Sequence, residues 1–156
     1  MGEGWETRRR RSGDRDWLTL RLGYAGTVAQ VVIDTSFYRY NASAAVARQG
    51  SRTGDAWAQL LSPTAIQPDT IHHFQAAPVG PVELVKVEAF PDGGLSRVRV
   101  IGHVDPAARA TAGWKWWHAL PDPHAAEVLA ALGLPTERPV DSEAPERLRR
   151  MLDGRL

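Results

Sequence analysis

Cysteine is absent from all 156 residues of the sequence. Without cysteine the protein has no disulfide framework, no thiolate nucleophile and no zinc or iron–sulfur centre held by thiolates. Long hydrophobic runs are absent as well. No apolar stretch approaches the roughly 20 residues that cross a bilayer, and no signal-type stretch follows the arginine-rich amino terminus. These absences predict a cytoplasmic protein with no membrane partner.

An excess of charge of one sign is also lacking, because 19 basic and 18 acidic side chains give a net charge of +1. Such a balance argues against a chain that wraps nucleic acid. The one basic run, residues 8–11, has acidic residues on both sides, including Glu6 and Asp14. We therefore expect no nucleic-acid partner. The common nucleotide-binding, serine-hydrolase and metalloprotease motifs do not occur either.

Alternating and β-branched segments fill the first two thirds of the chain. Leucine occupies every second position from Leu18 to Leu22, which predicts a half-buried strand from about Asp16. Residues 23–27 predict a turn, and the β-branched residues 28–34 predict a central strand. Further strands are predicted at residues 44–48, 70–76, 82–90 and 95–101.

The sequence Pro-Asp-Gly-Gly at residues 91–94 predicts a tight turn. It would join residues 82–90 and 95–101 as an antiparallel hairpin. The predicted buried face of this hairpin carries Val85, Val87, Ala89, Val98 and Val100. Because no helical pattern separates these strands, the chain up to Gly102 predicts an antiparallel β-sandwich.

Helical spacing begins after Gly102. Asp122 is a candidate N-cap, Gly133 a candidate helix end, and an apolar stripe lies between them. A second short helix is predicted at about residues 142–152. We therefore divide the chain into a sandwich domain, residues 1–102, and a helical tail, residues 103–156. We expect the tail to bury Trp116 or Trp117 against the sandwich or another chain, because three clustered tryptophans expose too large an apolar patch.

Residues 4–17 combine two tryptophans, five arginines and several acids in a stretch with little strand character. Guanidinium groups bind carboxylates bidentately, so arginines at a cavity rim suit a small acidic substrate. Glu6, Asp14 or Asp16 could orient such an arginine or transfer a proton. The alternative is that Trp5 and Trp17 seal an edge of the domain while the arginines are solvated.

A second candidate lies at residues 68–74, which contain His72 and His73. Neighbouring residues of a strand point to opposite faces, so the two histidines make a poor chelating pair. One of them could transfer a proton near neutral pH. The alternative is a structural histidine held by hydrogen bonds.

Five short segments, taken together and in order, resemble the allantoicase (allantoate amidinohydrolase) family. They are GWETRRRR at residues 4–11, Asp16-Trp17, IDTS at residues 33–36 with Asn41 after it, PDTxHxF at residues 68–74, and FPDGGLSRVRVIG at residues 90–102. The segment WWHALPDPHAAEVLAALG, residues 116–133, also resembles the carboxyl end of bacterial members. The resemblance therefore covers most of the chain.

The resemblance implies an all-β fold, a jelly-roll β-sandwich of the galactose-binding-like kind, here with a short helical carboxyl-terminal tail. It also implies hydrolysis of allantoate to ureidoglycolate and urea in purine degradation. Family members usually contain two such sandwich repeats, each with a strand-bearing segment before the GWE motif. This chain has one repeat and begins almost at the motif. We therefore expect activity in a homo-oligomer or beside a companion chain that completes the sandwich.

An allantoate site needs a cation for the carboxylate, polar partners for the ureido groups and a group that transfers protons. The candidate catalytic residues are His72, as the proton-transfer group, with Glu6 and Asp34. The candidate substrate-binding residues are Arg8, Arg10, Asn41 and Trp5. Histidines and carboxylates could hold a metal, but no ligand spacing demands one, and we expect no cofactor. The alternative function is a non-catalytic sandwich module that binds a sugar or an anion, or an inactive paralogue.

Overall fold

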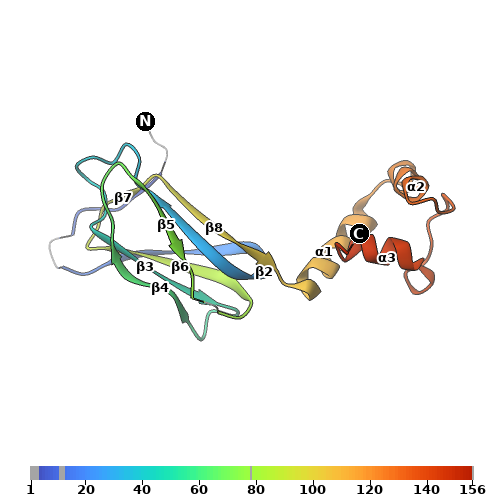
Figure 1. The fold of residues 1–156 in the computed structure, drawn as a ribbon, viewed down its shortest axis with the longest axis horizontal. Coiled ribbons are helices and arrows are strands. Elements are labelled where there is room, and N and C mark those ends of the chain that lie inside the picture. The colour runs from blue at the N-terminus through green and yellow to red at the C-terminus, as the bar shows by residue number, and fades with distance from the viewer. Residues whose placement is uncertain (1–3, 11–12, 78, 156) are drawn as a thin grey trace. The chain divides into compact units, whose positions relative to one another are not determined.

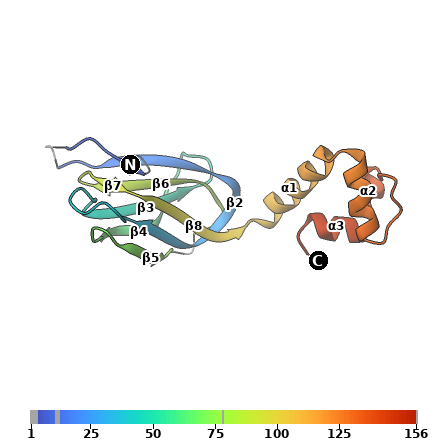
Figure 2. The ribbon, with the colours of Figure 1, turned by 90° about the horizontal axis from the view of Figure 1, so that it is seen from above.

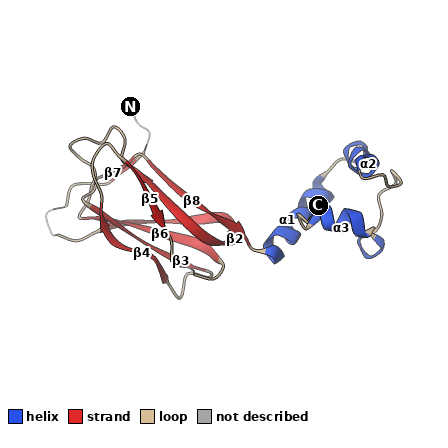
Figure 3. Ribbon diagram, in the orientation of Figure 1, coloured by secondary structure: helices blue, strands red, loops and turns tan. Residues whose placement is uncertain are grey.

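The computed structural model describes residues 4–10, 13–77 and 79–155. The chain forms two compact units, Met1–His103 and Val104–Leu156, which we call the sandwich unit and the helical unit. All strands described lie in or begin in the first unit, and all helices lie in the second (Figures 1 and 3). The strands are β1 Trp5–Glu6, β2 Asp16–Asp34, β3 Ala45–Ser51, β4 Ala58–Ala65, β5 Ile71–Gln75, β6 Val82–Phe90, β7 Gly94–Leu95 and β8 Arg97–Val104.

Strand β2 runs without interruption for 19 residues. The turn predicted at residues 23–27 is therefore wrong. The pairing register instead shifts between Arg21 and Gly26, an irregularity that bends a strand without ending it. Strand β2 pairs with β6 between Asp16 and Gly26, and with β5 between Gln30 and Asp34 (Figure 2). One long strand thereby changes partners along its length.

The larger sheet has the order β4-β3-β6-β2-β5, with β8 also paired to β2, while β1 and β7 form a small separate sheet. The predicted hairpin between residues 82–90 and 95–101 is wrong. Strand β6 already has β3 on one edge and β2 on the other, so neither edge can accept the following strand. The chain leaves β6 at Phe90, and Gly94 then donates its N–H to the carbonyl of Asn41 at 2.7 Å.

The inward face predicted for β6 is confirmed, because Val85, Val87 and Ala89 are fully buried. Val98 and Val100 of β8 are half-buried against the same core. The strands predicted at residues 44–48 and 70–76 correspond to β3 and β5. Strand β4 was not predicted, since its sequence AQLLSPTA carries a proline and few β-branched residues. The remaining buried side chains of the core come from Val28, Val31, Ile33, Val46, Leu60, Ile66, Val82 and Leu95.

The helical unit contains α1 Pro106–Ala119, α2 Asp122–Ala131, the 3-10 turn η1 Asp141–Glu143 and α3 Glu146–Leu152. Helix α2 is confirmed, although Pro121 rather than Asp122 occupies its N-cap position. Helix α1 was not predicted; Asp105 caps it by accepting hydrogen bonds from two backbone N–H groups. None of the helices described is long and apolar enough to cross a bilayer.

Trp117 is buried, but not where the sequence predicted. It packs in a core made by the helical unit itself, together with Leu129 and Leu148. Trp116 remains 47% exposed. The helical unit thus buries one of the clustered tryptophans in its own core.

Candidate functional site

Connections from distant parts of the sequence meet at the end of the sandwich that carries β1 and β7 (Figure 1). The loop that follows β2 is tied to the loop that precedes β5. Thr35, which is fully buried, donates its hydroxyl to the carbonyl of Gln67 at 2.7 Å and accepts a bond from the N–H of Thr70 at 3.0 Å. The carboxylate of Asp69 accepts the N–H of Phe37 at 2.8 Å. These bonds fix the two loops to each other.

The same loop is tied to β1. The side-chain amide of Asn41 donates to the carboxylate of Glu6. In the same loop, Tyr38 lies so close to Gly94 that a Cβ at position 94 would come within 2.0 Å of its ring. Burial, and secondarily the charge of Glu6, raises the pKa of the Tyr38 hydroxyl. The side chain of Tyr38 therefore stays neutral at physiological pH and packs on a position that only glycine can occupy.

Asp34 ends β2 and is only 6% exposed. Its carboxylate accepts the N–H of Ser36 at 2.9 Å, and Arg99 approaches it at 3.9 Å. Burial on its own would raise the pKa of Asp34, but the bonds from Ser36 and the charges of Arg99 and Arg97 together lower it. The carboxylate is therefore ionised at neutral pH.

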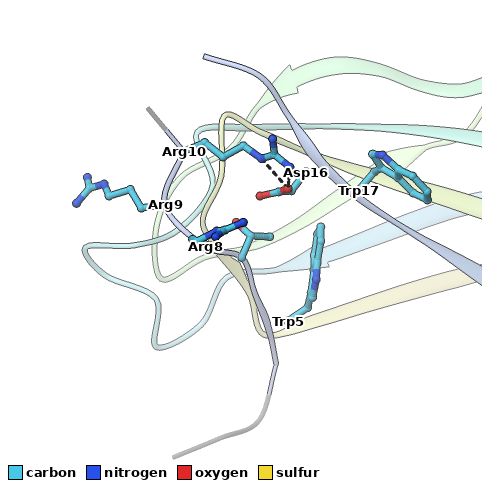
Figure 4. Close-up of a pocket in the computed structure, with 7 residues that line it drawn as sticks. Trp5, Arg8, Arg9, Arg10, Asp16 and Trp17 are labelled. Carbon is cyan, nitrogen blue, oxygen red and sulfur yellow. Dashed lines mark hydrogen bonds and ion pairs between the residues drawn. The ribbon is translucent and has the colours of Figure 1, made fainter. Parts of the chain in front are cut away.

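A cleft of about 550 Å³ lies between the amino-terminal segment and the start of β2 (Figure 4). We call it the arginine cleft; it is lined by Trp5, Thr7, Arg8, Arg9, Arg10, Asp16 and Trp17. Arg10 donates through Nε to Asp16 at 2.7 Å, and through a second nitrogen to the same oxygen. This hydrogen bond lowers the pKa of Asp16. Of the three acids that the sequence offered for orienting an arginine, Asp16 is the one that forms hydrogen bonds with Arg10.

The three arginines of the cleft differ in direction. Arg8 lies beside the Arg10–Asp16 pair, whereas Arg9 points away from it (Figure 4). Because the guanidinium of Arg10 is already bound to Asp16, Arg8 is better placed to receive an anion. Trp5 and Trp17 add flat apolar walls.

The predicted site residues other than His72 therefore fall into three places. Trp5, Arg8 and Arg10 line the arginine cleft, and Glu6 and Asn41 are bonded to each other next to β1. Asp34 is held at the end of β2. Sequence reasoning did not single out Thr7, which also lines the cleft, or Tyr38, which packs on Gly94.

His72 stands apart from the residues that line the arginine cleft. It lies on β5, where its Nε2 is 3.1 Å from both the N and the O of Gln67, and its ring stacks on Phe74 at 6.0 Å. These contacts resemble those of a structural histidine more than those of an unengaged base. Among the residues described, no group of three or more histidines and carboxylates is arranged to hold a metal ion.

Comparison with known proteins gives a consistent result. A family model described as the allantoicase repeat matches residues 1–105. A curated relative from Nocardia farcinica, named probable allantoicase, is 43% identical over 105 residues, which are 67% of this chain and 32% of the relative. The chain spans about a third of the length of the curated relatives that it matches.

Solved structures agree on the fold. The allantoicase of Saccharomyces cerevisiae has a TM-score of 0.60 and 31% identity, covering 64% of this chain and 31% of that one. The CBM32-3 domain of a Clostridium perfringens family 31 glycoside hydrolase has a TM-score of 0.53 at 9% identity, covering 64% and 74% of the two chains. The second likeness concerns the fold alone. Together they confirm the predicted galactose-binding-like β-sandwich.

Proposed function

Because the chain belongs to the allantoicase family, we propose that it takes part in the hydrolysis of allantoate. In this reaction water adds to the carbon that bears the two ureido groups, one C–N bond breaks, and ureidoglycolate and urea are formed. The relatives carry the name of this hydrolase. The observation that supports the proposal in this chain is the arginine cleft, which combines cations, polar groups and flat walls.

We assign the carboxylate of allantoate to Arg8. A guanidinium binds a carboxylate through two parallel N–H donors, which a lysine cannot reproduce. Arg10 and Asp16 would hold the neighbouring wall in place, because their side chains already bind each other. The planar ureido groups would lie against Trp5 and Trp17, and their polar atoms would face Asn41 and Glu6.

Proton transfer is assigned first to Glu6. It is exposed, it is oriented by Asn41, and it lies in sequence between Trp5 and Thr7, which line the cleft. A carboxylate so placed can accept a proton from the attacking water and return it to the departing urea. Asp34 would act on the loop through Ser36 rather than on substrate. His72 remains the alternative proton-transfer group.

We also propose that the working enzyme needs a second polypeptide. Since the chain spans about a third of its relatives, further polypeptide, from a second copy or from another chain, would complete the working enzyme. We propose the cytoplasm as its compartment, in keeping with the lack of cysteine.

The test is direct. Purified chain is incubated with allantoate, and urea and ureidoglycolate are measured, with the assembly state recorded by light scattering in the same buffer. Equal amounts of both products support the proposal. Saturable allantoate binding without products would instead indicate a non-catalytic binding module.

A further inference from the structure

The arginine run of the cleft, Arg8 to Arg10, has no regular structure of its own. Strand β1 ends at Glu6, and the three arginines belong to no helix or strand. Long side chains on an irregular segment lose conformational entropy when they bind a ligand, and this loss weakens binding. A cleft that binds an anion through Arg8 therefore needs contacts that hold the run in place.

Both ends of the run are attached to the loop between β6 and β7. At its start, the backbone N–H of Thr7 donates to the carbonyl of Gly93 at 3.1 Å, and the N–H of Gly93 donates to the Thr7 hydroxyl at 3.0 Å. At its end, the backbone N–H of Arg10 donates to the carboxylate of Asp92. Arg8 lies between these two anchor points, so its backbone is restrained from both sides.

The loop between β6 and β7 is itself fixed. Gly93 has a φ of +119°, a conformation that favours glycine. A Cβ at this position would come within 2.6 Å of the backbone nitrogen of Ser43 and within 2.8 Å of the carbonyl oxygen of Asn41. The loop therefore packs tightly on the segment that follows β2, and the arginine run is attached to a base with little freedom to move.

Asp92 binds the run in an unusual way for an acid close to several arginines. A carboxylate near guanidinium groups usually pairs with one of them, often through two hydrogen bonds. Here the guanidinium of Arg10 binds Asp16, whereas the carboxylate of Asp92 binds the backbone N–H of Arg10. Asp92 thus holds the course of the main chain, and Arg8 beside the Arg10–Asp16 pair is positioned by it (Figure 4).

We propose that Asp92 is a positioning residue for the anion site: through the backbone of Arg10 it holds the guanidinium of Arg8 in the direction that receives the carboxylate of allantoate. Only the identity of this anion rests on the proposed function. Binding depends on a hydrogen-bond acceptor at position 92 and not on its charge. A guanidinium that is already ordered loses less entropy on binding, so the contribution of Asp92 appears in KM and not in kcat.

The first measurement contains no substrate. The 15N{1H} NOE of the Arg8 backbone amide is compared in the full chain for wild type, Asp92→Ala and Asp92→Asn. The matched control is Asp55→Ala, because Asp55 is an exposed acid in the loop between β3 and β4. We expect the NOE to fall by roughly a third in Asp92→Ala and to stay unchanged in Asp92→Asn, whose amide oxygen still accepts the N–H. An unchanged NOE in folded Asp92→Ala would overturn the proposal.

A second variant covers the case in which Asp92→Ala does not fold. Asp92→Glu keeps the charge but moves the carboxylate by one methylene group. The NOE of Arg8 should therefore fall in Asp92→Glu and not in Asp92→Asn. The opposite order would mean that the charge of Asp92 acts on the arginines from a distance, and the proposal would be wrong.

The second measurement is the KM for allantoate. Asp92→Ala should raise KM about tenfold with kcat within about twofold of wild type, whereas Asp92→Asn should keep KM within about threefold. In an Arg8→Lys background, Asp92→Ala should change KM less than about threefold, because its effect passes through Arg8. An equal rise in both backgrounds would overturn the proposal. A wild-type chain that neither binds nor hydrolyses allantoate would refute the proposed function alone, since the NOE of Arg8 is read without allantoate.

Discussion

The side-chain amide of Asn41 is hydrogen-bonded to the carboxylate of Glu6, although 35 residues separate them in the sequence. The bond joins the GWE segment to the loop after β2, two of the segments by which the family resemblance was first drawn. The loop is held again by Gly94, whose N–H donates to the carbonyl of Asn41. FPDGG, at residues 90–94, is a third of these family segments, and it therefore lies against the same loop.

The assignment of proton transfer to Glu6 predicts different outcomes for two variants. Glu6→Gln keeps the size of the side chain but removes its basicity, so we expect turnover of allantoate to fall about 100-fold or more. His72→Ala should lower turnover by less than about tenfold, because the ring of His72 is engaged with Gln67. Steady-state kinetics of the two folded variants checks this, and the reverse order would transfer the role to His72.

The direction of the arginines predicts a second pair of outcomes. Arg8→Lys should raise the KM for allantoate about tenfold or more with little change in kcat, because an ammonium loses the bidentate contact. Arg9→Lys makes the same chemical change at a side chain that points away from the Arg10–Asp16 pair (Figure 4). Its KM should match the wild type. Equal KM values for the two variants would show that allantoate binding depends only on the total positive charge of residues 8–11.

The lowered pKa of Asp34 predicts how stability depends on pH. A carboxyl whose pKa is lower in the folded than in the unfolded state stabilises the fold above its ordinary pKa, near 4. That contribution is lost as the pH falls through the folded-state value. Asp34→Asn should therefore be less stable than wild type at pH 7, and the difference should shrink towards pH 3. Urea midpoints at the two pH values provide the measurement, and a constant difference would contradict the argument.

The burial of Trp117 within the helical unit tests the proposed domain division. Trp117→Ala removes the largest side chain of that core and should cost about 3–5 kcal/mol, which is enough to unfold a unit of this size. Circular dichroism at 222 nm should fall, while the thermal transition of the sandwich unit stays within about 2 °C of wild type. A single transition that moves as a whole would mean that the two units fold together.

The local sequence predicted β6 and α2 well, because in each the apolar residues recur with a clear period and a turn or capping residue marks the end. It failed where the outcome depended on partners that are distant in sequence. The turn at residues 91–94 could have closed a hairpin, but β3 and β2 occupy both edges of β6. Similarly, glycines in residues 23–27 indicated a turn, whereas the pairing of β2 with β6 and then β5 keeps that segment extended.

In the candidate site, too, sequence reasoning predicted local features and missed those that depend on residues distant in sequence. The residue types of residues 4–17 predicted arginines at the rim of a cavity, but they left open which acid would orient an arginine; the structure pairs Asp16 with Arg10. The strand that carries His72 was predicted, but the contacts of its ring were not, because they depend on the loop at Gln67.

The most direct test of the account is a titration of the 15N-labelled chain with allantoate, read at the tryptophan indole N–H resonances and assigned by substitution. The account predicts saturable shifts at Trp5 and Trp17, which line the arginine cleft, and none at Trp117, which lies in the helical core. A folded chain in which Trp5 and Trp17 do not respond at any allantoate concentration, in its monomeric or its assembled state, would contradict the central claim.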